Sequence, residues 1–130
     1  MNARIEHRAV RSDRLPQPSG PYSPAVAFDR LVFVSGQGAK DPANGRLVGM
    51  DIVSQTEQVL KNIASILQAA GSSLDHVLRC GVFLTDMSEF AAMNEVYARY
   101  FAHHPPARST VQVSRLPRDV RVEIDLIGLL

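Results

Sequence analysis

An arginine and a glutamate near the end of the chain are the residues whose types and spacing best suit chemistry. Arg108 follows the stiff run Pro-Pro-Ala at 105–107, and Glu123 lies between Val122 and Ile124. A guanidinium binds a carboxylate through two parallel hydrogen bonds, so Arg108 suits a ligand that carries a carboxylate. A partly desolvated glutamate titrates above its ordinary range and can accept a proton from water. The pair therefore predicts a small-carboxylate site beside a general base.

The same residues also have a structural interpretation. Arg108 could form a salt bridge with Glu123 or Asp125, because surface ion pairs are common and individually weak. Two further residues, Tyr22 and Asn94, could orient a ligand by hydrogen bonds, or could serve as a loop-packing aromatic and a helix-surface amide. Taken alone, these residue types indicate a carboxylate site and go no further.

Other reactive residue types do not form recognised motifs. The segment 36–38, Gly-Gln-Gly, lacks the third glycine of a dinucleotide-binding loop. Ser35 has no glycine two positions before it, which excludes the nucleophile elbow of hydrolases. His103 and His104 are adjacent and do not share one helix face, and Cys80 lies in an apolar run typical of a buried thiol. We therefore expect no metal.

The first half of the chain predicts a loop, a hairpin and turns. Four prolines between positions 16 and 24 predict an extended loop that contains Tyr22. Apolar runs at 25–28 and 31–35 predict a hairpin of two short strands. The segment 36–45 is rich in turn residues.

The second half predicts two helices and three strands. Apolar positions recur with a period of about 3.6 residues over 51–70, which predicts a helix that ends at Gly71. A second amphipathic pattern, capped by Asp86 or Ser88, predicts another helix. In chain order, we expect a helix over 51–70, a brief turn over 74–78, a strand over 77–84, a helix to Phe101, and a final hairpin of strands 108–114 and 120–126 around a turn at 116–119.

These elements predict a single α+β domain over residues 1–130. Each helix has one apolar stripe, and one sheet can cover both, so we expect a two-layer fold with a mixed β-sheet covered on one face by two helices. The other face of the sheet stays open. In the last strand Arg121, Glu123 and Asp125 point to that face, which meets solvent or lines a wet cleft between subunits.

Composition narrows the classes of partner. The chain has 130 residues with 14 Lys and Arg against 13 Asp and Glu. This net charge of +1 is too small to attract nucleic acid or a membrane surface by electrostatics. The longest uncharged stretch, 15–28, is too short and too broken by prolines to span a bilayer. The one feature that favours RNA binding is a cluster of four N-terminal arginines. A single cysteine and the lack of an apolar leader pattern favour the cytoplasm.

Several separated segments resemble the RidA family, also called the YjgF family, in residue type, order and spacing. The resemblance covers nearly the whole chain. It is carried by Gly20-Pro21-Tyr22-Ser23, Ser35-Gly36-Gln37, Asn94-Glu95-Val96-Tyr97, Pro106-Ala107-Arg108-Ser109-Thr110-Val111, Ser114-Arg115-Leu116-Pro117 and Val122-Glu123-Ile124.

This resemblance implies a fold, an assembly and a reaction. The fold is a chorismate-mutase-like α+β domain, and the assembly is a homotrimer with clefts between subunits. The reaction is hydrolysis of reactive 2-imino acids, such as 2-iminopropanoate and 2-iminobutanoate, to 2-oxo acids and ammonia. A protonated imine is already electrophilic, so this chemistry needs neither a metal nor an organic cofactor.

The resemblance also implies roles for individual residues. Arg108 would hold the substrate carboxylate and Glu123 would position or activate the attacking water. The remaining substrate-binding residues would be Tyr22, Ser35, Gly36, Asn94 and Thr110.

The chain departs from the family pattern at three places. Thr110 stands where many relatives have cysteine, Pro24 stands where glutamine is frequent, and Gly-Ala-Lys at 38–40 replaces an apolar-proline step. These departures bear on the substrate more than on the reaction. Two alternatives therefore stay open, a deaminase of a larger substrate such as 2-aminomuconate and a non-catalytic trimer that binds small carboxylates.

Overall fold

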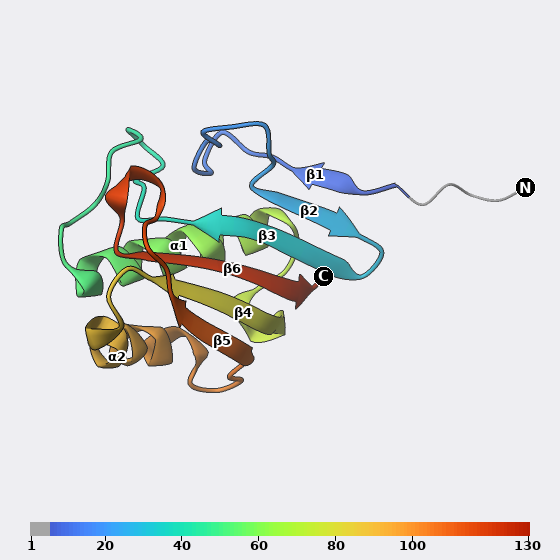
Figure 1. The fold of residues 1–130 in the computed structure, drawn as a ribbon. Helices are drawn as coiled ribbons and strands as arrows, with labels where there is room; N and C mark the ends of the chain where they lie inside the picture. The colour runs from blue at the N-terminus through green and yellow to red at the C-terminus, as the bar shows by residue number, and fades with distance from the viewer. Residues whose placement is uncertain (1–5) are drawn as a thin grey trace, which may run out of the picture.

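The computed structural model describes residues 6–130 and contains a six-stranded sheet with both helices on one of its faces (Figure 1). Arg4, one of the four N-terminal arginines, lies outside the described residues. The predicted two-layer α+β fold with a mixed sheet is confirmed. In their order across the sheet, the strands are β1 (Arg8–Val10), β2 (Ala25–Phe28), β3 (Leu31–Gln37), β6 (Val122–Leu129), β4 (Val77–Leu84) and β5 (Ala107–Gln112).

Two helices, α1 (Ile52–Ala69) and α2 (Phe90–Phe101), cover the sheet, and three short 3-10 turns connect elements: η1 (Leu74–His76), η2 (Met87–Glu89) and η3 (Pro117–Asp119). Both predicted helices and the strand β4 are confirmed. The carboxylate of Asp86 accepts a hydrogen bond from the backbone N–H of Ser88 at 2.9 Å, so Asp86 caps the turn that leads into α2.

Helix α1 is capped at both ends. The carboxylate of Asp51 accepts the backbone N–H of Ser54 at 2.8 Å, which satisfies one free donor of the first turn. At the other end Gly71 has φ +83°, and the N–H of Ser72 donates to the carbonyl of Leu67 at 2.8 Å. This is a Schellman motif. Between these ends, one side of the helix is fully buried against the sheet, through Val59, Leu60, Ile63, Ile66 and Leu67.

The predicted final hairpin is wrong. β5 pairs with β4 in parallel, and β6 lies between β3 and β4, antiparallel to both. The chain reaches β5 through α2, a crossover that returns it to the same end of the sheet where β4 begins. Alternation is present in both segments, but alternate residues of β6 are buried and no residue of β5 is. β6 is therefore a central strand and β5 an edge strand.

The N-terminal half follows its prediction closely. β2 and β3 form the expected hairpin, and the proline-rich loop before them contains no helix or strand. β1 was not predicted; its three residues pair with β2 and form the other edge of the sheet.

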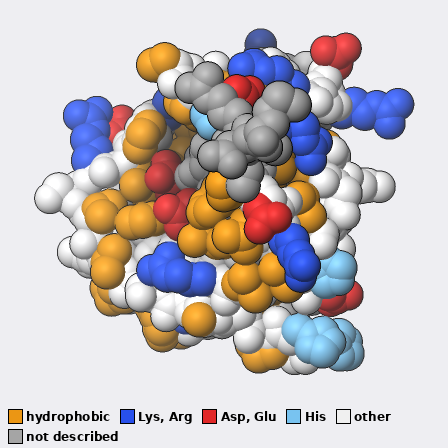
Figure 2. Space-filling model, turned by 90° about the vertical axis from the view of Figure 1, so that its right-hand side faces the viewer, with side chains coloured by type: hydrophobic (Ala, Val, Ile, Leu, Met, Phe, Trp, Pro, Cys, Tyr) orange, Lys and Arg blue, Asp and Glu red, His pale blue; other side chains and the backbone are white. Residues whose placement is uncertain are grey.

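No helix covers the second face of the sheet within residues 6–130. Large apolar side chains lie exposed there, with 40% of Phe33 and 45% of Val111 accessible to solvent. Exposed apolar residues also gather at the end of the sheet where β6 ends, among them Phe28, Leu129 and Leu130. Figure 2 looks at this end and shows hydrophobic side chains between separate acidic and basic ones. Among the described residues, no helix has the length and apolar character needed to cross a membrane.

Candidate active site

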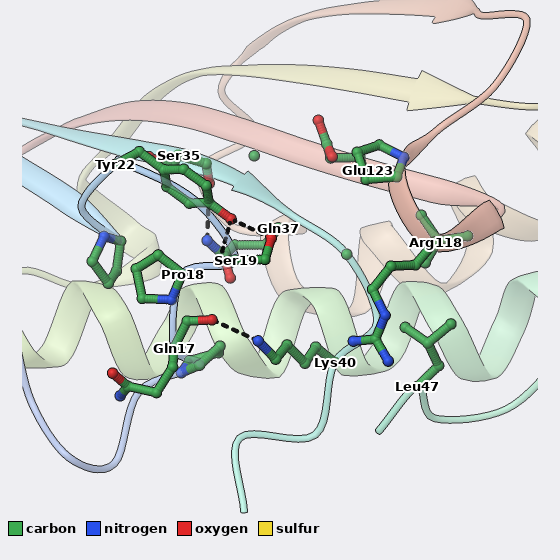
Figure 3. A pocket seen from close by; sticks show the side chains of 16 residues that line it. Gln17, Pro18, Ser19, Tyr22, Ser35, Gln37, Lys40, Leu47, Arg118 and Glu123 are labelled. Atoms are coloured by element: carbon green, nitrogen blue, oxygen red, sulfur yellow. Dashed lines mark hydrogen bonds between the residues drawn. The ribbon is translucent and has the colours of Figure 1, made fainter. Parts of the chain in front are cut away.

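A cavity of about 370 Å³ opens between the proline-rich loop, β3 and the start of β6 (Figure 3). Its volume lies in the range typical of small-molecule sites. Four of the residues predicted for substrate binding or catalysis line it, namely Tyr22, Ser35, Gly36 and Glu123. The other three, Asn94, Arg108 and Thr110, do not.

Glu123 projects from the open face of the sheet against the backbone of β3. A Cβ atom on Gly36 would lie 2.5 Å from its Oε2 atom, so any side chain at position 36 would force the carboxylate to move from this position. Within residues 6–130 this carboxylate has no hydrogen-bond or ion-pair partner. Burial raises its pKa above the ordinary value, and the neighbouring carboxylate of Asp125 raises it further. A carboxylate in this state is suited to accept a proton from a bound water.

A β-bulge shapes the wall of the cavity next to Glu123. The register of β3 against β6 shifts between Val34 and Gln37, with one extra residue in β3. Bulges of this kind occur beside active sites, where they re-aim side chains. Ser35 lies in the bulge, and its hydroxyl donates to the carbonyl of Ser23 at 2.7 Å. This bond ties β3 to the loop that carries Tyr22 and leaves the hydroxyl oxygen of Ser35 able to accept.

Tyr22 forms the opposite wall of the cavity from Arg118 (Figure 3). Its hydroxyl oxygen accepts the backbone N–H of Ser19 at 3.2 Å and lies 3.3 Å from the Oγ atom of Ser19. The ring remains 46% exposed in one chain. It is thus held at the cavity while keeping a surface free for a ligand or a second subunit.

Two cations that the sequence did not single out as site residues also line this cavity. Arg118 has φ 59° and the following Asp119 has φ 57°, a left-handed conformation that costs a non-glycine residue about 1 kcal/mol. Arg115 forms an exposed ion pair with Asp119, with Nε and Oδ1 2.6 Å apart. The guanidinium of Arg118 donates to the carbonyl of Gly45 at 2.9 Å.

Lys40, the second cation, lies in the segment noted above as departing from the family pattern. Its Nζ atom donates to the carbonyl of Gln17 at 2.6 Å. Its own carbonyl accepts the side-chain amide of Asn62 at 2.7 Å. Asn62 is only 2% exposed and projects from α1. A polar residue among the apolar positions of that helix is the sequence signal that could have identified this anchor.

Arg108 belongs to a second hollow, beside α2. Its guanidinium carbon lies 4.6 Å from the centre of the Tyr97 ring and 5.6 Å from that of Phe90. Both distances suit a cation–π contact, which fixes the plane of the guanidinium. Asn94, Tyr97 and Pro105 line the same hollow of about 390 Å³. The structure thus brings Arg108 and Asn94 together in one hollow.

Arg108 and Glu123 project from opposite faces of the sheet. Arg108 pairs in register with the fully buried Cys80, whereas Glu123 pairs with Phe83 of the same strand. Paired residues share a face, and side chains three positions apart on one strand lie on opposite faces. Thr110 lies on the Arg108 side, as predicted. The predicted hairpin, which would have paired the strands that carry these two residues, is absent. Within residues 6–130 Arg108 makes no ion pair with Glu123 or Asp125.

No group of three or more His, Cys, Asp or Glu side chains within residues 6–130 is arranged to hold a metal ion. Cys80 is buried, as predicted for a structural thiol, and burial raises its pKa. The described residues thus place a guanidinium, that of Arg108, on one face of the sheet and a partly buried carboxylate, that of Glu123, on the other.

Residues 12–129 match the family model described as Endoribonuclease L-PSP. The chain belongs to this family. It is the RidA family that the sequence motifs resemble, and the chain is 42% identical over 125 residues to a mouse (Mus musculus) protein named 2-iminobutanoate/2-iminopropanoate deaminase, covering 96% of this chain and 93% of the relative.

Other members of the RidA family carry less specific names. A protein of Myxococcus xanthus named DfrA is 49% identical over 128 residues, covering 97% of this chain and 98% of the relative. Among solved structures, RidA from an Antarctic Psychrobacter has a TM-score of 0.91 and 40% identity, covering 95% of this chain and 99% of that one. Family and fold are therefore established together.

Proposed function

We propose that this protein hydrolyses 2-imino acids to 2-oxo acids and ammonia at a site shared by two copies of the chain. The observation that carries the proposal is the placement of a carboxylate-binding arginine and an unpartnered, partly buried glutamate on opposite faces of one sheet. The deaminase name of relatives about 40% identical supports the reaction class.

A small imino acid is too short to reach both residues in one chain. The strands that carry them are separated by β4, which puts their backbones about 10 Å apart, and the sheet itself lies between the side chains. A neighbouring copy that packs on the open face can bring its own Arg108 and Asn94 to the cavity that holds Glu123. The exposed apolar side chains of that face, such as Phe33 and Val111, suit such an interface. A closed ring of three copies satisfies this head-to-tail contact.

The proposed reaction begins with recognition of the substrate carboxylate. The guanidinium of Arg108, flattened against Tyr97 and Phe90, binds the carboxylate by two hydrogen bonds and presents the C=N carbon to the cavity. A water donates a proton to Glu123 while the oxygen of that water bonds to the C=N carbon, which forms a tetrahedral carbinolamine. Glu123 then returns this proton to the amine nitrogen and takes the proton of the carbinolamine hydroxyl as the C–N bond breaks, which releases ammonia and leaves the 2-oxo acid. Loss of that last proton to solvent restores the ionised Glu123. Positioning supplies most of the acceleration, since the protonated imine is already reactive.

The test follows imine decay by semicarbazide trapping after an amino-acid oxidase has generated the imine. The protein should reduce trapping, and Arg108→Ala and Glu123→Gln should each abolish that effect while keeping the far-ultraviolet circular dichroism of the parent. If the parent protein leaves trapping unchanged for a series of imines, the deaminase assignment is wrong and the alternative of a carboxylate-binding module stands.

A mixing experiment tests whether the site is shared. Arg108→Ala and Glu123→Gln chains, unfolded together and refolded, should regain about a quarter of the parent activity, because random pairing unites one intact Arg108 with one intact Glu123 in that fraction of interfaces. The matched control replaces the second chain by the double variant Arg108→Ala/Glu123→Gln, which restores no site. A mixture as inactive as this control would show that Arg108 and Glu123 do not act together across an interface between copies, which would refute the shared site.

A further inference from the structure

The cavity beside Glu123 contains more positive charge than a neutral imino acid needs. Lys40 and Arg118 both line it. Within residues 6–130, Glu123 is the only acidic residue that lines this cavity. Neither cation forms an ion pair within residues 6–130. Lys40 donates a hydrogen bond to the carbonyl of Gln17 and Arg118 donates one to the carbonyl of Gly45, and a carbonyl does not neutralise a positive charge. Each cation keeps further N–H donors for a ligand.

Each cation is held at the cavity by a hydrogen bond to a carbonyl, although Arg118 is exposed. Lys40 is partly buried, and its backbone is tied to the helix layer by the buried amide of Asn62. Arg118 and the following Asp119 both have left-handed backbone conformations, which direct the Arg118 side chain, and Asp119 forms an exposed ion pair with Arg115. Strained backbone of this kind persists where the surrounding structure fixes it, and it is concentrated at ligand sites.

The charged ends of Lys40 and Arg118 lie across the cavity from the Glu123 carboxylate (Figure 3). A substrate whose imine carbon is near Glu123 would therefore direct its side chain toward the two cations. The side chain of 2-iminopropanoate or 2-iminobutanoate is one or two carbons long and fills only a small part of the 370 Å³ cavity of a single chain. A longer side chain that ends in a carboxylate fills this space and meets both cations.

We propose that Lys40 and Arg118 form a side-chain subsite that makes acidic 2-imino acids, such as 2-iminosuccinate and 2-iminoglutarate, the preferred substrates. This inference rests on the proposed function, because it assumes that the imine carbon lies beside Glu123. The second carboxylate carries a charge that the subsite cations balance, whereas a neutral side chain leaves them hydrated.

Binding of stable products tests the subsite without turnover. We expect calorimetric titration to show that 2-oxoglutarate binds about tenfold more tightly than 2-oxopentanoate, which has the same carbon number and lacks the distal carboxylate. Lys40→Met and Arg118→Met should each remove this preference and leave the Kd of 2-oxopentanoate within about twofold. Lys61→Met is the matched control, because Lys61 is exposed on α1 and does not line the cavity; it should change neither Kd.

Equal affinity of the parent protein for the two oxo acids would overturn the subsite. So would a Lys40→Met variant that weakens both ligands alike. Turnover separates this inference from the proposed function: imines made by an oxidase from glutamate and from norvaline are compared by semicarbazide trapping. Acceleration of the norvaline imine alone leaves deamination intact and refutes the acidic preference, whereas acceleration of neither imine refutes deamination itself.

Discussion

The carboxylate of Glu123 occupies the space that a side chain at position 36 would fill, with its Oε2 atom 2.5 Å from the place of a Cβ atom on Gly36. The backbone of β3 and the carboxylate of β6 are thus packed without clearance at the point where the bulge lies. Glycine is needed here for space, since the bulge does not give this residue a positive φ. The position of the proposed base depends on that contact.

Gly36→Ala should reduce kcat by about 10²-fold, because the added methyl pushes the Glu123 carboxylate by an ångström or more from the attacking water. Steady-state deamination kinetics measure this loss. Gly38→Ala is the control, since a Cβ there would meet Val120 at an ordinary 3.5 Å. Equal activity of the two alanine variants would show that the position of the carboxylate does not limit the reaction.

The rate should depend on the ionisation of Glu123, whose pKa is raised by burial first and by Asp125 second. A base must be ionised, so kcat/KM should rise with pH through a midpoint above 4.5, the ordinary pKa of this carboxyl. Asp125→Asn should move that midpoint to lower pH and can retain the hydrogen bond that Asp125 accepts from the N–H of Gly81. A midpoint that stays in place would remove Asp125 from the electrostatics of the site.

Glu123 should also make folding stability depend on pH. A raised pKa means that the folded state binds this proton more tightly than the unfolded state, so stability falls as pH rises from about 4.5 through the raised pKa. Glu123→Gln should abolish this fall, and its free energy of unfolding in urea should exceed that of the parent at pH 7 but not at pH 4. A difference in stability between the parent and Glu123→Gln that stays constant over this range would contradict the burial of the carboxylate.

Replacement of Arg108 by lysine keeps the charge but loses the planar fork that lies on Tyr97. We expect Arg108→Lys to lower kcat/KM by about 10- to 100-fold. Tyr97→Phe keeps the ring, so it should leave kcat/KM within about twofold. The Tyr97 hydroxyl is buried beside the Cys80 thiol and the Arg108 guanidinium without a hydrogen bond of ordinary geometry, so its removal should change the free energy of unfolding by less than about 1 kcal/mol. A large kinetic effect of Tyr97→Phe would instead assign the hydroxyl a role with the substrate.

Asn62 connects the helix layer to the cavity by donating to the carbonyl of Lys40. Asn62→Ala leaves that carbonyl without its buried partner and should lower the free energy of unfolding by about 2 kcal/mol. Urea denaturation measures the change, and Lys61→Ala on the exposed side of α1 should change it by less than about 0.5 kcal/mol. A loss confined to oxo-acid binding, with stability unchanged, would mean that Asn62 orders the loop without stabilising the fold.

Local elements were predictable because their signals are local. The period of the apolar residues and the caps at Asp51 and Gly71 define α1 within the chain itself. Strand partners were not predictable in the same way, because alternation tells which side chains share a face and says nothing of the neighbouring strand. The parallel crossover through α2 therefore placed β5 at an edge, away from β6.

The candidate site was half predictable for a related reason. Residue type identified Arg108 and Glu123 and also suggested Tyr22 and Asn94, and the family resemblance supplied Ser35, Gly36 and Thr110. Their grouping into two hollows depends on the sheet order, which the sequence pattern does not contain. The role of Gly36 depends on a contact of a few ångströms between strands, which no pattern of residue types reveals.

The central position of β6 has a consequence for biosynthesis. β6 follows every other strand in the chain, yet β3 and β4 are joined in the sheet only through it. On the ribosome the first five strands therefore emerge as two incomplete sheets, each with an unpaired apolar edge that waits for the same segment. Nascent chains stalled before Val122 should be a substrate for chaperones, and release of that segment is the step that closes the sheet.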